Sequence, residues 1–90
     1  MSTREEFKKR VEEWSKKIRV NYTTIQFRKM SRKWSSYSIR GRLTFDPEIL
    51  NKDRAFQDEV IVHELLHIRY PNHGKMFKQM LEYYLKLQKE

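Results

Sequence analysis

The sequence of 90 residues contains no cysteine, and this absence excludes disulfide bonds, thiolate nucleophiles and thiolate ligands. Any metal site in the chain must therefore use nitrogen and oxygen donors. A long apolar run is also missing, because the stretch over residues 60–68 is interrupted by two histidines and a glutamate. We therefore expect no segment that spans a membrane. The first residues are polar and charged, unlike a signal peptide, so a cytoplasmic location is expected.

Glycine and proline are scarce, with two residues of each, and no Gly/Pro-rich linker divides the chain. We therefore expect one domain over residues 1–90. Hydrophobic residues make up 38% of the chain and charged residues 36%. This balance fits a folded globular protein rather than a disordered one.

Acidic residues are outnumbered, because 12 Asp and Glu accompany 20 Lys and Arg, which gives a net charge of +8. The excess is largest over residues 28–42, where six basic side chains occur without an acidic one. Such a segment fits a solvated surface, and it equally fits a surface that attracts nucleic acid or an acidic substrate. Nucleic acid is therefore a candidate partner of residues 28–42, while the oligomeric state is left undefined by the sequence.

The apolar pattern predicts an α+β fold of three helices and two strands. In the first helix, Phe7, Val11, Trp14 and Ile18 recur at helical spacing. Polar residues 31–40 are expected to form a turn region, so that the two strands make an antiparallel hairpin or part of a small sheet, with helices on one face. The predicted elements are helices over 3–19, 53–70 and 74–88, and strands over 22–30 and 41–46.

The three histidines of the chain, His63, His67 and His73, lie within eleven residues. The first two are four residues apart in a predicted helix, where their directions differ by about 40°, so both imidazoles project from one face. That arrangement suits two zinc ligands. Pro71 then ends the helix, which allows His73 to approach from another direction as a third ligand. The fourth position stays open for water, which is typical of a catalytic zinc site.

Glu64 lies one residue beyond the first histidine, about 100° further round the helix, close to the metal without being a ligand. From there it can take a proton from a metal-bound water, so the segment predicts a zinc-dependent metallopeptidase that hydrolyses peptide bonds. We expect one zinc ion per chain, with His63, His67 and His73 as ligands and Glu64 as the catalytic base. The partner is then a peptide or protein substrate.

Other interpretations of this segment stay open. The histidines could form a surface cluster without a metal, or the zinc could be purely structural in a basic nucleic-acid-binding module. Glu82, on the last predicted helix, could replace His73 as the third ligand. A zinc-dependent endoribonuclease is a further alternative, because one bacterial family of such enzymes has three histidines at this spacing, with glycine in the place of Glu64.

Aromatic side chains supply further candidates. Trp34, beside the basic residues, either packs in the core or stacks on a nucleic-acid base. Each of Tyr70, Tyr83 and Tyr84 could hydrogen-bond the oxyanion of a tetrahedral intermediate, although core or surface packing also explains them. The edge of the predicted sheet could pair with an extended peptide substrate by strand addition.

The stretch over residues 31–77 resembles the YgjP-like metal-dependent hydrolases, which are relatives of the SprT-like proteases. The family pattern is an Arg-Trp-Gly-Ser-Cys-like turn, a glycine before a short strand, a helix with HELxH, and then Pro-Asn-His. The corresponding segments here are residues 33–37, 41–43, 63–67 and 71–73. The first segment departs from the pattern, because it reads Lys-Trp-Ser-Ser-Tyr. The resemblance implies a minimal zincin fold, one zinc ion and peptide-bond hydrolysis.

Overall fold

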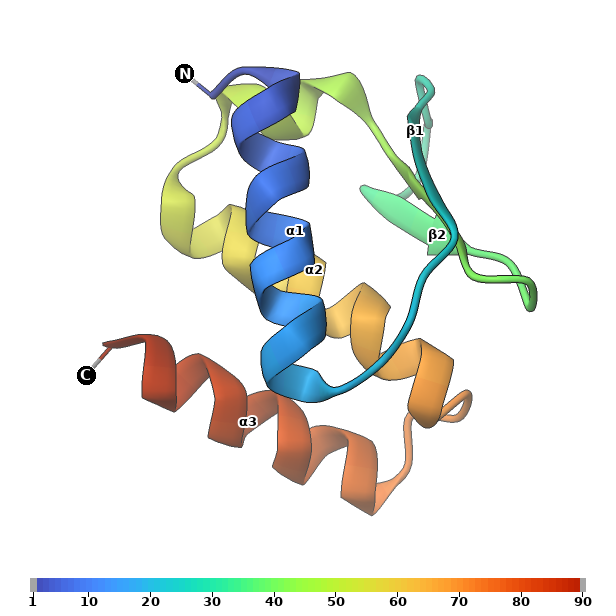
Figure 1. The fold of residues 1–90 in the computed structure, drawn as a ribbon, viewed down its shortest axis with the longest axis vertical. Coiled ribbons are helices and arrows are strands. Elements are labelled where there is room, and N and C mark those ends of the chain that lie inside the picture. The colour runs from blue at the N-terminus through green and yellow to red at the C-terminus, as the bar shows by residue number, and fades with distance from the viewer. Residues whose placement is uncertain (1, 90) are drawn as a thin grey trace.

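The computed structural model describes residues 2–89, in which the secondary-structure elements form an α+β fold (Figure 1). The three predicted helices are confirmed to within one residue at each end. The predicted strands are also present, though both are shorter than expected. In chain order the elements are α1 (Arg4–Ile18), β1 (Thr24–Phe27), β2 (Ser35–Tyr37), β3 (Arg42–Phe45), the 3₁₀ helix η1 (Pro47–Asn51), α2 (Arg54–Arg69) and α3 (Lys75–Lys89).

The sheet has the strand order β1-β3-β2, and its pairing differs from the prediction. The two predicted strands, β1 and β3, lie side by side in parallel, with Ile25 opposite Leu43. A third strand, β2, arises within the expected turn region and pairs antiparallel to β3, with Tyr37 opposite Leu43. The alternative of an antiparallel hairpin was therefore wrong, whereas the alternative in which the two strands are part of a small sheet is confirmed. The chain between β1 and β3 is long enough to place β2 on the far side of β3 before it returns.

The strand β2 escaped prediction because its residues, Ser35, Ser36 and Tyr37, lack the apolar alternation of a half-buried strand. It lies at the edge of the sheet and is held by pairing to the buried strand β3. The turn between the two strands contains Gly41 at φ +87, where a side chain would also crowd the backbone nitrogen of Thr23 at 3.2 Å. Glycine meets both conditions without strain.

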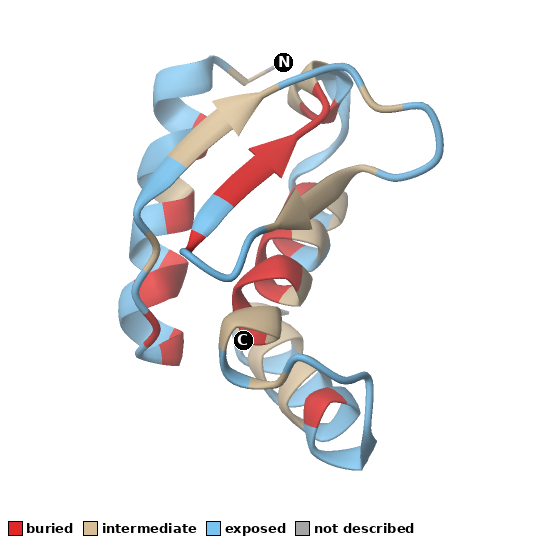
Figure 2. Ribbon diagram, turned by 90° about the vertical axis from the view of Figure 1, so that its right-hand side faces the viewer, coloured by how far each residue is buried: buried red, intermediate tan, exposed pale blue. Residues whose placement is uncertain are grey.

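Helices α1 and α2 cover the same face of the sheet, which lies in front of both in Figure 2. The helix α1 starts at a capping box, in which Thr3 and Glu6 each accept a backbone N–H from the other. Its predicted apolar face is buried in the core that the two helices share with β3. The buried residues of that face are Phe7, Val11, Trp14 and Ile18.

Polar contacts hold α2 against α1 at a fixed rotation. Asp58 on α2 is buried, forms an ion pair with Arg10 and accepts a hydrogen bond from the indole nitrogen of Trp14 at 3.1 Å. Gln57, also buried, donates to the carbonyls of Ile49 and Lys52 at 2.8 and 3.1 Å. Because buried polar groups require such partners, α2 cannot rotate without breaking these bonds. The opposite side of α2 therefore faces β2 in one defined register.

The segment between β1 and β2 is fastened to the sheet by Asp46. Its carboxylate accepts hydrogen bonds from the backbone nitrogens of Met30 and Glu48, both at 2.8 Å, and caps η1. These N–H donors, that of Met30 first, hold the pKa of Asp46 below its ordinary value. No helix within residues 2–89 has the length and apolar character needed to cross a membrane.

Candidate metal centre

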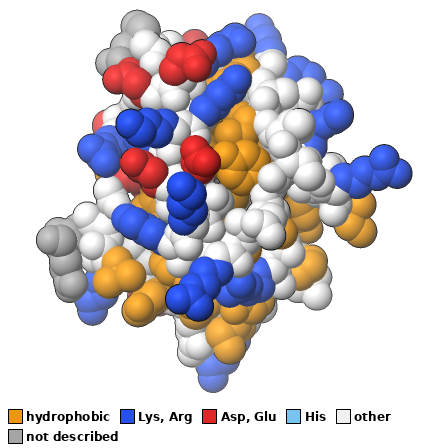
Figure 3. Space-filling model, in the orientation of Figure 1, with side chains coloured by type: hydrophobic (Ala, Val, Ile, Leu, Met, Phe, Trp, Pro, Cys, Tyr) orange, Lys and Arg blue, Asp and Glu red, His pale blue; other side chains and the backbone are white. Residues whose placement is uncertain are grey.

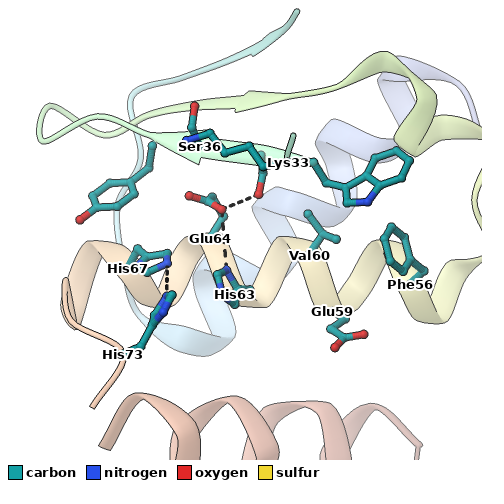
Figure 4. Close-up of a pocket in the computed structure, with 12 residues that line it drawn as sticks. Lys33, Ser36, Phe56, Glu59, Val60, His63, Glu64, His67 and His73 are labelled. Atoms are coloured by element: carbon teal, nitrogen blue, oxygen red, sulfur yellow. Dashed lines mark hydrogen bonds and ion pairs between the residues drawn. The ribbon is translucent and has the colours of Figure 1, made fainter. Parts of the chain in front are cut away.

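Helix α2 supplies two of the three histidines from one of its faces. Asp53 caps this helix by accepting the backbone N–H of Phe56 at 2.8 Å, and the following turns bring His63 and His67 into line. Their ring centroids lie 4.8 Å apart. Both rings project from the same side of the helix, as their spacing predicts (Figure 4).

The third histidine returns from the connection between α2 and α3. Helix α2 ends at Arg69, and Pro71 prevents it from continuing. The chain then turns so that Nε2 of His73 lies 2.7 Å from Nε2 of His67, the contact drawn in Figure 4. The ring of His73 is also close to that of His63, with 5.0 Å between centroids.

The three imidazoles fit a zinc ion. One nitrogen from each of His63, His67 and His73 can be chosen so that all three lie within 4.8 Å of one another. Zinc–nitrogen bonds of about 2.0–2.1 Å in a tetrahedron place two ligand nitrogens roughly 3.3 Å apart. The 2.7 Å between Nε2 of His67 and Nε2 of His73 and the 4.8 Å limit on all three separations lie on either side of that value, so the spacing is compatible with a zinc ion. The donor set is also chemically suitable, because neutral imidazole is a preferred zinc ligand.

Two aromatic rings confine the histidines. Phe77, on the first turns of α3, is buried and lies 5.2, 4.9 and 4.7 Å from the ring centroids of His63, His67 and His73. On the other side, Tyr37 of β2 stacks on His67, with 5.2 Å between centroids and only 8° between the planes. The sequence pattern gave no indication of this contact between Phe77 and all three histidines.

His67 lies in an environment that favours its neutral form. Burial lowers the pKa of this imidazole, and the neighbouring His63 and His73 lower it further. The nearby carboxylate of Glu64 acts in the opposite direction but does not reverse the shift. Because only the neutral imidazole can bind a metal ion, the surroundings of His67 suit a ligand.

Glu64 points from α2 toward β2 and lies close to His63 (Figure 4). Its side chain is buried, with 4% of the residue exposed, and Oε2 lies 3.8 Å from Nδ1 of His63. Oε2 also accepts a hydrogen bond from Oγ of Ser35 on β2. The carboxylate therefore lies beside the three histidines, held by a hydroxyl that the sequence did not single out. Ser35 stands where the resembling family pattern has glycine.

A cleft of about 540 Å³ opens between β2 and α2 and contains this group. Its lining includes Glu64 and the three histidines, together with the β2 segment. Beyond Glu64 the wall becomes apolar and is formed by Trp34, Phe56 and Val60, the last two of which are labelled in Figure 4. The candidate catalytic groups therefore face an open cavity rather than the protein interior.

The remaining sequence candidates lie elsewhere. Glu82 belongs to a separate depression with Glu59 and Lys78, outside the group of converging ligands. Tyr70, Tyr83 and Tyr84 do not line the cleft within the described residues, whereas Tyr37 does. Trp34 meets the ring of Phe56 edge-on at 5.3 Å, with the ammonium of Lys52 over its face at 5.1 Å, so these neighbours cover part of its surface.

The basic residues of the segment 28–42 fall into two groups, one before β2 and one after it. The first group lies in the connection that leads into β2 and consists of Arg28, Lys29, Arg32 and Lys33. All but Arg28 line a second depression, where Asp46 and Glu48 offset their charge. The second group consists of Arg40, in the turn between β2 and β3, and Arg42, the first residue of β3. On the face shown in Figure 3, Lys and Arg side chains are spread widely, while the acidic ones gather in the upper part.

Comparison with known proteins places this geometry in a wider context. The family model described as "YgjP-like, metallopeptidase domain" matches residues 1–90. No curated protein sequence gives a significant match.

Two solved structures share the fold, and both are described as metallopeptidase zymogens. Pyrococcus abyssi abylysin has a TM-score of 0.76 and 20% identity, over 84% of this chain and 76% of that chain. Methanocaldococcus jannaschii jannalysin has a TM-score of 0.76 and 24% identity, over 91% of each chain. At these identities the likeness shows a common fold.

Proposed function

The chain belongs to the YgjP-like metallopeptidase domain family, and on this premise we propose that it hydrolyses peptide bonds with a zinc ion held by His63, His67 and His73. The convergence of three imidazole nitrogens within 4.8 Å, at the wall of an open cleft, carries the proposal. Zinc is the metal proposed because three neutral imidazoles with an open fourth position are the ligand set of a catalytic zinc site.

Glu64 acts as the base in this proposal. A zinc ion held by the three histidines would supply Lewis-acid polarisation of the scissile carbonyl and would lower the pKa of the attacking water to about 7. The carboxylate of Glu64 accepts a proton from that water and donates it to the nitrogen of the leaving amine. The hydroxyl of Ser35 donates to Oε2, which orients the carboxylate and leaves Oε1 free to exchange the proton.

In this proposal the substrate binds along the strand β2. It is at the edge of the sheet, beside the cleft, and its outer backbone groups have no strand partner within residues 2–89. An extended peptide can add to such an edge through main-chain hydrogen bonds. A peptide lying along β2 would carry its backbone past Glu64 and the histidines.

The metal content of purified variants tests the ligand set. We expect about one zinc ion per wild-type chain and strongly reduced zinc affinity in His63→Ala, His67→Ala and His73→Ala, measured by competition with a chromogenic chelator. Glu82→Ala is the matched control, because Glu82 lies outside the converging group, and it should bind zinc like the wild type. Full occupancy in His73→Ala together with zinc loss in Glu82→Ala would show that the third ligand is wrongly assigned.

The reaction is tested with two substrate classes in parallel. A library of blocked peptides and a mixed-sequence RNA should be incubated with the zinc-loaded protein and analysed by mass spectrometry. We expect peptide fragments and intact RNA, because Glu64 supplies the base that peptide hydrolysis requires. Metal-dependent RNA cleavage with intact peptides would favour the endoribonuclease alternative and contradict this proposal.

A further inference from the structure

The cleft extends beyond the proposed catalytic group into an apolar wall formed by Trp34, Phe56 and Val60. Val60 and Phe56 precede Glu64 by four and eight residues on α2, so all three lie along one face of the helix. Trp34 comes from the other side, immediately before β2. Figure 4 shows Phe56 and Val60 following one another along the helix that bears Glu64 and His63.

This wall lies within reach of a residue next to the scissile bond. At about 1.5 Å per residue, Val60 is about 6 Å and Phe56 about 12 Å from Glu64 along the helix axis. A long side chain of a residue adjacent to the bond at Glu64 reaches Val60, and Phe56 lies one helical turn beyond Val60. The edge-on contact between Trp34 and Phe56, with 5.3 Å between ring centroids, closes the end of the apolar wall that is farther from Glu64.

The edge position of β2 determines how many substrate side chains can contact the apolar wall of the cleft. Successive side chains of an extended peptide point to opposite sides. If the peptide pairs with β2, one of the two residues at the scissile bond turns toward the wall on α2, and the other turns away from it. The cleft therefore distinguishes one position of the substrate.

The chemistry of the wall favours an apolar occupant. Trp34, Phe56 and Val60 are each partly exposed, so a ligand can cover apolar surface that water now contacts. The charged residues near the wall are Lys33 and Glu59 at the rim, which are exposed and of opposite sign, and Lys52, whose ammonium lies over the face of Trp34. A charged side chain pushed between the three apolar side chains would lose hydration that their hydrocarbon surfaces cannot replace.

We propose that Trp34, Phe56 and Val60 form a specificity subsite that binds an aromatic or long aliphatic side chain next to the scissile bond. The protein is then a peptidase for sites marked by one bulky apolar residue. This inference deepens the proposed function and rests on it. Complete burial of such a side chain corresponds to an affinity about 10- to 150-fold higher than that of a ligand with glycine at the same position.

The test uses hydroxamates of single amino acids, which chelate zinc and carry one side chain. L-Phenylalanine hydroxamate and glycine hydroxamate should be titrated into the zinc-loaded protein by calorimetry. We expect the phenylalanine compound to bind about 10- to 150-fold more tightly. In Phe56→Ala, and in Val60→Trp where the new ring fills the subsite, the ratio should fall toward one while the affinity for glycine hydroxamate stays within about two-fold.

The control variant truncates an apolar residue away from the cleft. Leu87 on α3 is 47% exposed, and Leu87→Ala should keep the wild-type ratio. Circular dichroism and zinc content confirm that each variant is folded and loaded. Equal affinities for the two hydroxamates in the wild type, or an unchanged ratio in both cleft variants, would overturn the subsite while leaving the zinc site standing.

A second measurement does not depend on zinc. N-acetyl-L-phenylalaninamide and N-acetylglycinamide should be added to the metal-free protein with ¹³C-labelled valine methyl groups. We expect the phenylalanine compound alone to shift the Val60 signals, while those of Val11, which is 0% exposed, stay in place. Val60 signals that respond to neither compound, or equally to both, would refute the subsite. If hydroxamates fail to bind but Val60 responds selectively, the proposed zinc chemistry fails and the subsite stands.

Discussion

Truncation of Phe77 should damage the fold and the metal centre together. The residue is 3% exposed, and its ring lies within 5.2 Å of the ring centroids of His63, His67 and His73. Replacement of a buried phenylalanine by alanine costs about 3–5 kcal/mol. A domain of this length has a total stability of roughly 5–13 kcal/mol at the usual value per residue, so Phe77→Ala should remain folded with a small margin or unfold near room temperature.

The assay is thermal unfolding with a chelator and with excess zinc. For a domain of this size 1 kcal/mol shifts Tm by about 4–8 °C, so Phe77→Ala should lose at least about 12 °C in the chelator. Zinc should raise Tm in wild type and variant because it binds the folded state. The rise should be smaller in the variant, since His73 loses the ring that packs against it. Chelator competition should show the same loss of zinc affinity.

Tyr83→Ala is the matched control for Phe77→Ala. Tyr83 is an aromatic residue of the same helix but is 54% exposed, so its truncation should change stability by about 0.5 kcal/mol or less. A Phe77→Ala protein with the Tm and zinc affinity of the wild type would refute the packing argument. If Tyr83→Ala lost as much Tm and zinc affinity as Phe77→Ala, the effect would come from any truncation in α3 and would not depend on the contacts of Phe77.

Three further variants test separate parts of the structure. Asp46→Asn should lower Tm at pH 7, because the pKa of Asp46 in the folded protein lies below its value of 3.8 in the unfolded chain. The charged carboxylate therefore stabilises the fold above pH 3.8, and this stabilisation is lost as the pH falls through the folded pKa. The difference in Tm between variant and wild type should vanish over the same range. Ser35→Ala should reduce kcat for peptides while KM and zinc content stay unchanged, because Glu64 loses its orienting bond, and Ser36→Ala should retain wild-type kcat. Neutralising the basic side chains of residues 28–42 should flatten the salt dependence of any binding to nucleic acid, measured by fluorescence anisotropy.

For each of these three variants, one result would contradict the proposed role of the residue. A difference between Asp46→Asn and wild type that persists in strong acid would mean that the carboxylate charge does not support the fold. Equal effects of Ser35→Ala and Ser36→Ala on kcat would remove the specific role of the Ser35 hydroxyl. Absence of binding to DNA and RNA at low salt would leave the charge of residues 28–42 as a feature of a solvated surface.

Local signals in the sequence were sufficient for the helices and for the alignment of the histidines on α2. Thr3 and Asp53 cap the helices that they precede, Pro71 ends α2, and the spacing of His63 and His67 determines their common face. These features depend on residues a few positions apart, where propensity and periodicity are informative. The approach of His73 followed from the turn at Pro71.

Features that depend on tertiary packing could not be predicted in this way. The strand β2 carries serines that have little strand propensity, and it exists because β3 offers a free edge. The bond from Ser35 to Glu64 joins residues that are 29 positions apart. Phe77 lies in the first turn of α3, and only the packing of α3 against α2 shows that its ring contacts the histidines.

The most direct test of the central claim compares the wild type with Glu64→Gln, measuring zinc content and peptide hydrolysis on the same samples. Glutamine keeps the shape and the helix propensity of the residue but cannot act as the base. The proposed chemistry predicts one zinc ion per chain in both proteins and hydrolysis slower by about 10²–10⁴-fold in the variant. Loss of zinc from Glu64→Gln, hydrolysis at the wild-type rate, or a zinc-loaded wild type that cleaves none of the peptides would contradict it.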